Sequence, residues 1–224
     1  MSVLTMRWRD TLFAHWPVAP EVVAERLPDA LSLDTYDGRA WLGVVGFLME
    51  DVGPRGVPFG LTFPELNLRT YVTRGGEPGV YFFNLDAGDR LSVAIARRFF
   101  RLPYYRAEMR FERRGRGVTL RSRRLHPGAY PLGFEATYGP TSGGVRDRER
   151  ADFLTERYRF YTESDDGRLY AGDVEHDPWP LRRGQATFER NDCFAANDFD
   201  HPTGDPVLYY CPRLDVRAGR LRRA

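Results

Sequence analysis

The sequence predicts one mainly β domain, a β-rich α+β fold over residues 1–224, built as a barrel or a strongly curved sheet. Three observations favour this fold class. Aromatic residues make up 14% of the chain, and aromatic side chains are enriched in strands. Several segments alternate polar and apolar residues, whereas few have helical spacing. No repeat, low-complexity tract or linker divides the 224 residues.

The first part of the chain is predicted as strands interrupted by one short helix. Residues 5–18 are strand-like, and a proline opens a helical segment at residues 20–27. Residues 31–49 predict a β-hairpin around the tight-turn pair Asp37-Gly38. Its second strand, residues 40–49, is almost wholly apolar, so we expect both of its faces to be buried.

The stretch FPELNLRTYV, residues 63–72, predicts a strand with one polar and one apolar face. Glu65, Asn67 and Arg69 share the polar face. The later elements are a strand at 80–86, a helix at 87–100 capped by Asp89, strands at 104–112 and 118–124, a helix and a hairpin about Asp166-Gly167 within residues 150–179, and a strand at 205–216. About three helices are therefore expected.

The charge balance restricts the classes of partner and of chemistry. The 33 basic and 31 acidic residues leave a net charge of +2, which disfavours a nucleic-acid-binding protein. Every basic residue is arginine, so a lysine Schiff base cannot form on this chain. The only cysteines, Cys193 and Cys211, fit no metal-ligand or disulfide pattern and favour a cytoplasmic location. The N-terminal sequence predicts no signal peptide and no membrane anchor.

Seven ordered blocks between residues 13 and 181 carry a family resemblance: FAHWPV, DGRAWLGVVGF, FPELNLRTYV, PGVYFFNLDA, RLPYYRAEM, FLTERYRFY and HDPWPL. Together they resemble the YqjF-like family of uncharacterised proteins, which belongs to the acetoacetate decarboxylase-like superfamily. The resemblance implies a closed, cone-shaped antiparallel β-barrel with helices outside and a ligand cavity inside. It also implies a homo-oligomer, but it supplies no activity.

The resemblance also locates a site. In acetoacetate decarboxylase, a Pro-Lys-Lys step carries the Schiff-base lysine and its neighbouring cation. That step corresponds to Pro103-Tyr104-Tyr105 here, and a phenol cannot form an imine. The decarboxylase mechanism is therefore excluded at this position. The glutamate of the decarboxylase's strand motif corresponds to Glu65.

The polar strand faces are predicted to meet in the barrel cavity, because apolar faces then pack under the outer helices. Tyr104, Arg106 and Glu108 share one face of their strand, with Tyr105 on the other. Glu65 is the candidate general acid or base, and Tyr104 the candidate proton donor to an enolate-like oxygen. The expected substrate-binding residues are Asn67, Arg69, Arg106 and Glu108, with an arginine holding a carboxylate. The alternative is a half-exposed strand whose polar face meets water.

Three further features have weaker functional interpretations. His15 is a candidate catalytic base, although a lone histidine is more often structural. Asp173, Glu175, His176 and Asp177 cluster in GDVEHDPW, but their spacing predicts a polar strand end and no metal site. The arginine-rich segment 110–124 is interpreted as a solvated hairpin, since it lacks exposed aromatics for RNA stacking.

The sequence thus predicts a small-molecule cavity with an anionic ligand. It predicts no cofactor, no nucleic-acid partner and no membrane association. Two functions stay open: an enzyme acting on a carbonyl or carboxylate compound without a Schiff base, or a non-catalytic ligand-binding protein.

Overall fold

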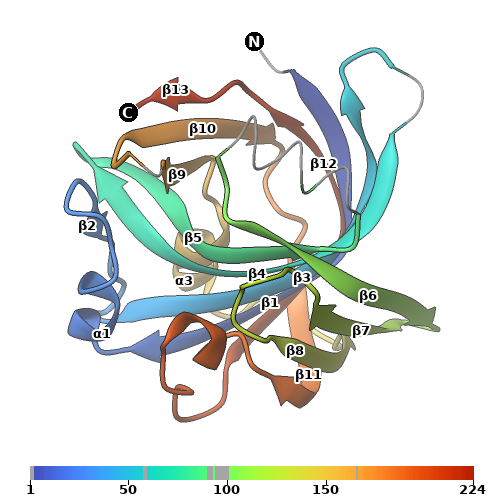
Figure 1. Cartoon of the computed structure of the whole chain (residues 1–224). Coiled ribbons are helices and arrows are strands. Elements are labelled where there is room, and N and C mark those ends of the chain that lie inside the picture. The colour runs from blue at the N-terminus through green and yellow to red at the C-terminus, as the bar shows by residue number, and fades with distance from the viewer. Residues whose placement is uncertain (1–2, 58–59, 90–92, 94–100, 165) are drawn as a thin grey trace.

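A computed structural model describes residues 3–57, 60–89, 93, 101–164 and 166–224. Strands dominate the described part of the chain (Figure 1). The strands are β1 (Leu4–Val18), β2 (Ser32–Leu33), β3 (Ala40–Pro54), β4 (Leu61–Arg74), β5 (Glu77–Ala87), β6 (Tyr104–Arg114), β7 (Gly117–Arg124), β8 (Gly133–Pro140), β9 (Arg159–Glu163), β10 (Leu169–His176), β11 (Arg182–Asn191), β12 (Val207–Ala218) and β13 (Arg222–Arg223). The helices are α1 (Pro20–Ala24), α3 (Arg148–Thr155) and the short 3-10 helix η2 (Ala195–Asn197).

The sheet closes on itself. Strands β5, β6, β7, β8, β11, β12, β1, β3 and β4 pair in that order, and β4 pairs with β5 to complete a nine-stranded barrel. The pairings of β5 with β6 and of β5 with β9 are parallel, whereas the other pairings described are antiparallel. The predicted mainly β, closed barrel is therefore confirmed, with a mixed sheet in place of a wholly antiparallel one.

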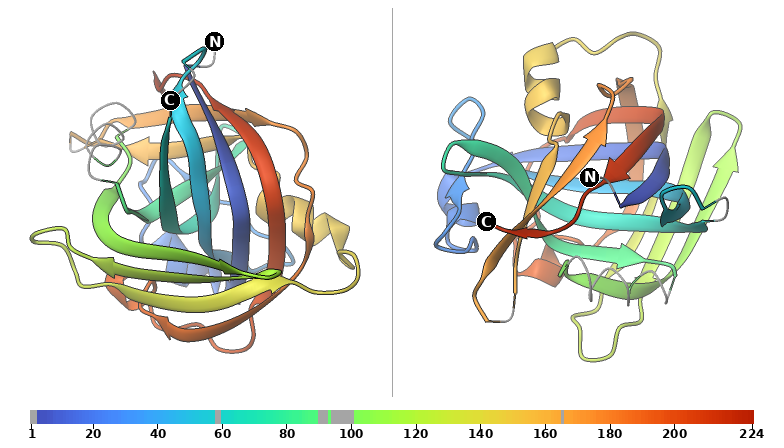
Figure 2. Two further views of the ribbon diagram at one scale, coloured as in Figure 1. Left: turned by 90° about the vertical axis from the view of Figure 1, so that its right-hand side faces the viewer. Right: turned by 90° about the horizontal axis from the view of Figure 1, so that it is seen from above.

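The hairpin of β9 and β10 closes a second ring on the other side of the central sheet. Strand β9 pairs with β5, and β10 pairs with β12, so β9 and β10 bridge two strands of the barrel. Figure 1 shows β9 and β10 above the long strands and β7, β8 and β11 below them. In the left view of Figure 2, the long strands lie side by side and the layer of β6, β7 and β8 crosses at one end. Strands β12, β1, β3, β4 and β5 thus form a wall shared by both rings.

Both faces of this shared wall are buried, which explains the apolar sequence of β3. On one face, Leu66 and Leu68 of β4 join Leu120 of β7 in the core that fills the nine-stranded barrel. On the other face, Val45 and Phe63 belong to a second core, which includes residues of α3 and β9. Strands β7 and β8 therefore cover the apolar face of β4, where helices were expected.

A β-bulge in β1 keeps apolar side chains facing the second core. The register of β1 against β3 shifts around Asp10, whose φ is 48°. Because successive strand residues point to opposite faces, a one-residue insertion reverses the alternation. Phe13 and His15 face the second core beyond the bulge, and the even-numbered Met6 and Trp8 face it before the bulge.

Strand β3 contains a matching irregularity. Its register against β4 shifts between Met49 and Val52, and Asp51 has a φ of 54°. Met49 before the bulge and Val52 after it both pack in the second core. Asp is among the residues that tolerate a left-handed conformation, which suits it to both bulges.

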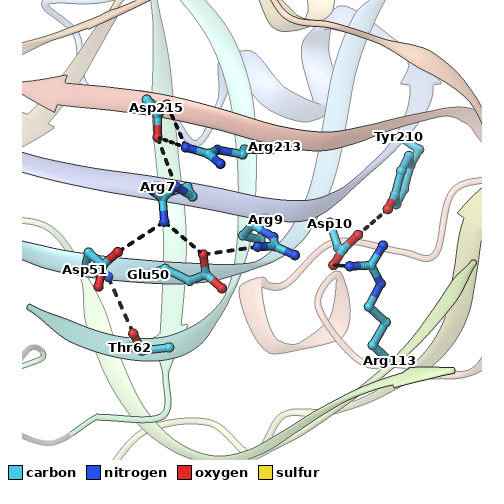
Figure 3. A network of polar contacts seen from close by, with 10 residues as sticks. All are labelled: Arg7, Arg9, Asp10, Glu50, Asp51, Thr62, Arg113, Tyr210, Arg213 and Asp215. Atoms are coloured by element: carbon cyan, nitrogen blue, oxygen red, sulfur yellow. Dashed lines mark hydrogen bonds and ion pairs between the residues drawn. The ribbon is translucent and has the colours of Figure 1, made fainter. Parts of the chain in front are cut away.

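Charged residues occupy the opposite face at the two bulges (Figure 3). Arg7 forms ion pairs with Asp215 at 3.0 Å, Asp51 at 3.2 Å and Glu50 at 3.6 Å. Buried Asp10 accepts a hydrogen bond from Tyr210 and lies 3.7 Å from a guanidinium nitrogen of Arg113. The network thus gives partners to the side chains of Asp10 and Asp51, the two residues with positive φ in the bulges.

Two predicted elements differ from the structure. The turn at Asp37-Gly38 is present, with both residues at positive φ, but β2 pairs with β4 and not with β3. The hairpin over residues 31–49 was therefore wrong, because long-range pairing to β4 competes with the local turn. The predicted helix at 87–100 lies mostly outside the described residues; its first residue, Ala87, instead ends strand β5, and Val93 is helical and buried.

Candidate functional site

A cavity of about 540 Å³ lies between the shared wall and the β9–β10 hairpin. Residues of β1, β3, β4, β5, β9, β10 and β12 line it, and Tyr104 joins them from the start of β6. The cavity therefore occupies the second ring, because Leu66, Leu120 and their neighbours fill the nine-stranded barrel. Two residues of the polar face of β4, Glu65 and Arg69, line this cavity.

Glu65 is a buried carboxylate in the cavity wall, with 2% of its surface exposed. Asn67 Nδ2 donates a hydrogen bond to Oε1 at 3.0 Å, and the Tyr104 hydroxyl donates to Oε2. Burial raises the pKa of Glu65 from 4.5 to about 7, although the hydrogen bonds from Tyr104 and Asn67 and the charge of Arg69 lower it in part. Such a carboxyl exchanges a proton readily near neutral pH.

Tyr104 connects β6 to this carboxylate. It lines the cavity, and burial together with the neighbouring Glu65 raises the pKa of its phenol well above 10. The phenol therefore stays protonated and acts as a hydrogen-bond donor. Tyr105 points elsewhere, with Arg124 4.1 Å from its ring centre and His126 packed edge-on against it. Tyr104 therefore faces the cavity and Tyr105 does not, which matches the prediction that the two side chains lie on opposite faces of the strand.

Arg69 lines the same cavity and lies four residues beyond Glu65 on the same face of β4. Its guanidinium carbon lies 5.4 Å from the ring centre of Phe13, and burial lowers its pKa. Its Nε has no hydrogen-bond partner. The charge of Glu65 and a hydrogen bond to Tyr71 raise its pKa in part, but among the described residues no carboxylate forms a direct ion pair with it. Because Glu65 has a raised pKa, it compensates this buried cation only in part, so the site is suited to an anion.

Sequence reasoning missed two other arginines of the lining, Arg157 and Arg159. Arg157 binds Asp34 at 2.7 Å, and Arg159 binds Asp173 at 2.7 Å. Both are thus neutralised by the protein, which distinguishes them from Arg69. Arg159 is the first residue of β9, and Arg157 lies two residues before it. Because the long-range pairing of β9 with β5 brings both to the cavity, no local sequence pattern could reveal them.

His15 does not line the cavity. It is fully buried, and its Nε2 lies 2.7 Å from the Tyr71 hydroxyl. Because that hydroxyl donates to the Leu154 carbonyl at 2.7 Å, His15 Nε2 must be the donor to Tyr71. Burial and Arg69 lower the pKa of His15 well below 6.5, so it is neutral. The structure assigns it a packing role that joins β1, β4 and α3, which corrects the expectation of a catalytic base.

Three predicted substrate-binding residues also lie outside the lining. Asn67 is turned toward Glu65 and positions it. Arg106 is half-buried where β6 leaves β5, and its backbone N–H donates to His126. Glu108 is exposed and pairs with Arg123 on β7. From Ala107 onward β6 pairs with β7, so the face that carries Tyr104 at the cavity becomes the outer surface at Glu108.

The arginine-rich segment is balanced by acids from neighbouring strands. Arg121 pairs with Glu135 at 2.8 Å, and Arg124 forms a buried pair with Asp86 at 2.8 Å. At the GDVEHDPW stretch, His176 stacks on Tyr158, and Asp173 binds arginines. The described residues contain no group of three or more potential metal ligands. They also contain no helix with the length and apolar character needed to cross a bilayer.

Comparison with known proteins places these features in a family. A family model, DUF2071, described as an uncharacterized conserved protein, matches residues 5–215. The chain belongs to the DUF2071 family. This DUF2071 chain is also 40% identical, over 226 aligned positions, to the uncharacterized protein YqjF of Bacillus subtilis (strain 168), covering 99% of this chain and 92% of that protein.

Solved structures share the fold at low identity. Acetoacetate decarboxylase from Legionella pneumophila superposes with a TM-score of 0.72 at 13% identity, over 99% of this chain and 87% of that chain. The enduracididine biosynthesis enzyme MppR, complexed with pyruvate, gives a TM-score of 0.67 at 14% identity, over 100% and 91% of the two chains. These matches establish an acetoacetate decarboxylase-like fold for the DUF2071 chain.

Proposed function

We propose that this protein is an enzyme that transfers a proton on a small carboxylate- or carbonyl-containing substrate, by enolisation or isomerisation, without a Schiff base. One observation carries the proposal: a buried carboxylate, Glu65, lines a cavity beside Arg69, a cation that no described carboxylate pairs. Arg69 would hold the substrate carboxylate, and Glu65 would remove or return the proton on the adjacent carbon.

Tyr104 supports this assignment as a positioning residue. Its hydroxyl and the Asn67 amide fix both oxygens of Glu65, so the carboxylate is oriented before substrate arrives. The chain contains no lysine, so an imine on a lysine side chain is excluded. No cofactor is required for proton transfer by these groups. Two free, buried cysteines support a reducing compartment such as the cytoplasm.

Hydrogen–deuterium exchange tests the proposal without knowledge of the product. Purified protein is incubated in deuterated water with a panel of oxo- and hydroxy-acids, and exchange at carbon is followed by NMR. Glu65→Gln should slow exchange at least about 100-fold. Glu108→Gln, which changes an exposed glutamate on β6, is the control and should leave exchange unchanged. Equal exchange by wild type and Glu65→Gln would refute the role of Glu65.

A non-catalytic ligand-binding function is the second candidate. It is favoured by the same two hydrogen bonds, because a carboxylate that already accepts from Asn67 and Tyr104 is well suited to a fixed structural role. This function predicts that carboxylates raise the melting temperature while no acid exchanges deuterium. Exchange that depends on Glu65 would exclude it.

A further inference from the structure

The cavity is long and changes character along its length. Along β4 its lining extends from Leu61 to Arg69, a path of about 26 Å at the rise of an extended strand. Leu61 pairs with Val52 near the end of β3, Glu65 pairs with Phe47 in its middle, and Arg69 pairs with Gly43 near its start. Arg69 therefore lies at one end of this path, and Glu65, with Tyr104 bonded to it, lies near the middle.

The other end of the cavity is apolar. Side chains of β1, β3, β4 and β10 line it there: Met6, Trp8, Met49, Val52, Phe63 and Val174. Trp8 stacks on Trp179 with ring centres 5.5 Å apart, which makes a flat aromatic wall. Around Met6, Trp8, Met49, Val52 and Phe63 the lining is apolar; Arg159, the charged lining residue beside Val174, is paired with Asp173, and the charges of Arg7, Glu50 and Asp51 lie on the opposite face of the sheet (Figure 3).

The two β-bulges produce this apolar end. Without the shift at Asp10, the alternation of β1 would turn Arg7 and Arg9 toward the cavity in place of Met6 and Trp8. Without the shift at Asp51, Val52 would turn away from it. Bulges that re-aim side chains are common beside binding sites. The fold thus maintains an apolar surface over a distance that a short polar substrate does not use.

We propose that the ligand is an amphipathic carboxylate with an extended apolar tail. Its carboxylate pairs with Arg69, and its tail runs past Phe63, Trp8 and Met49 toward Val52 and Val174. The position of a reacting carbon beside Glu65 rests on the proposed function, whereas the site for the apolar tail does not depend on it. A saturated or aromatic tail fits a lining that offers hydrophobic and aromatic contacts but few hydrogen bonds.

A chain-length series measures the tail site directly. Acetate, butyrate, octanoate and decanoate are titrated into the full-length protein by calorimetry, below the concentrations at which micelles form. Affinity should increase about fourfold per added methylene until the tail reaches Val52 and Val174, as expected for burial of apolar surface. Octanol should bind far more weakly than octanoate, because it has no group to pair with Arg69. Affinity that does not change with chain length, or octanol binding as tightly as octanoate, would overturn the inference.

Two variants test the contacts of the apolar tail and of the carboxylate separately. Val174→Phe fills the apolar end and should weaken decanoate binding at least about tenfold while leaving butyrate unchanged. Val22→Phe, at an exposed position of α1, is the matched control. Arg69→Gln should weaken octanoate but not octanol, whereas Arg110→Gln, on the exposed face of β6, should change neither. Melting temperatures establish that each variant is folded.

The same measurements keep this inference distinct from the proposed function. Glu65→Gln should retain the chain-length series even if it abolishes deuterium exchange. A rising series without exchange in the wild type would uphold the tail site and reject the catalytic role. Deuterium exchange of short oxo-acids, together with an affinity that does not increase with chain length, would uphold the catalytic role and reject the tail site.

Discussion

The ionisation of Glu65 results from opposing influences that the structure separates. Burial favours the neutral acid, and hydrogen bonds from Tyr104 and Asn67 and the charge of Arg69 favour the carboxylate. Burial has the larger effect, so the pKa rises to about 7. Both protonation states are then populated near neutral pH, which is what a group that accepts and returns a proton requires.

This pKa makes the stability of the protein depend on pH. Since the pKa of Glu65 is higher in the folded chain than its ordinary 4.5, proton binding stabilises the fold fully below about pH 4.5, and this contribution is lost as the pH rises through about 7. Glu65→Gln cannot ionise, so above pH 7 it should be more stable than wild type by at most about 3 kcal/mol. Urea unfolding at pH 5 and pH 8 measures the difference.

Glu108→Gln provides the contrast, because Arg123 lowers the pKa of Glu108 through a hydrogen bond. This variant should show no gain at pH 8. If Glu65→Gln gains no stability between the two pH values, Glu65 titrates at an ordinary pKa.

Anion binding should also move a proton. Arg69 lowers the pKa of Glu65, and a ligand carboxylate beside Arg69 would offset that charge, so the pKa of Glu65 should increase on binding. Near pH 7 the complex would take up a fraction of a proton. Calorimetry of octanoate binding in two buffers with different ionisation enthalpies should give different heats for wild type and equal heats for Glu65→Gln. Equal heats for the wild type would contradict this coupling.

At the scale of residues, alternation within β4 and the start of β6, taken together with the barrel resemblance, predicted a shared cavity for Glu65, Arg69 and Tyr104. It failed for Glu108, because β6 changes its pairing partner between these residues. The interpretation of His15 as a base rested on the chemistry of histidine, and only the fold shows that Tyr71 and Leu154 enclose it. A strand pattern records which face a residue occupies, but not what covers that face.

At the scale of elements, the bulges of β1 and β3 decide which side chains reach the cavity. Neither was predictable from the alternation, because a bulge appears in the sequence only as a break in a pattern that loops also break. The turn at Gly167 was predictable, since it joins β9 and β10, which are neighbours in the chain. Pairing between distant strands, such as β2 with β4, was not.

Asp10 should be needed for the β1 bulge. Asp10→Ala removes the acceptor used by Tyr210 and Arg113 and places alanine at a φ of 48°, so it should destabilise the protein by about 2–3 kcal/mol. Asp37→Ala has a similar φ of 51° in an exposed turn, and should cost only about 1 kcal/mol from the backbone. Urea unfolding of both variants tests this. Equal losses would show that the buried hydrogen bonds of Asp10 contribute nothing.

At the scale of the molecule, composition and alternation predicted a mainly β domain, and the family resemblance predicted its closure. The second ring was not predictable, because it depends on β9 and β10 reaching β5 and β12 across the whole chain. Its consequence for function is large. One ring is filled by a packed core, and the other contains the cavity, so a single wall of strands supports both the rigid scaffold and the site.

Closure also limits how copies of this chain can associate. The strand order ends at β13 and β2, and each of these terminal strands has only two residues. Little backbone at these ends is therefore left for a strand of another molecule to extend the sheet, which protects a β-rich chain against edge-to-edge aggregation. A homo-oligomer of the kind the resemblance implies would then be held together by side chains on the outer faces of the barrel, with its subunits joined surface to surface.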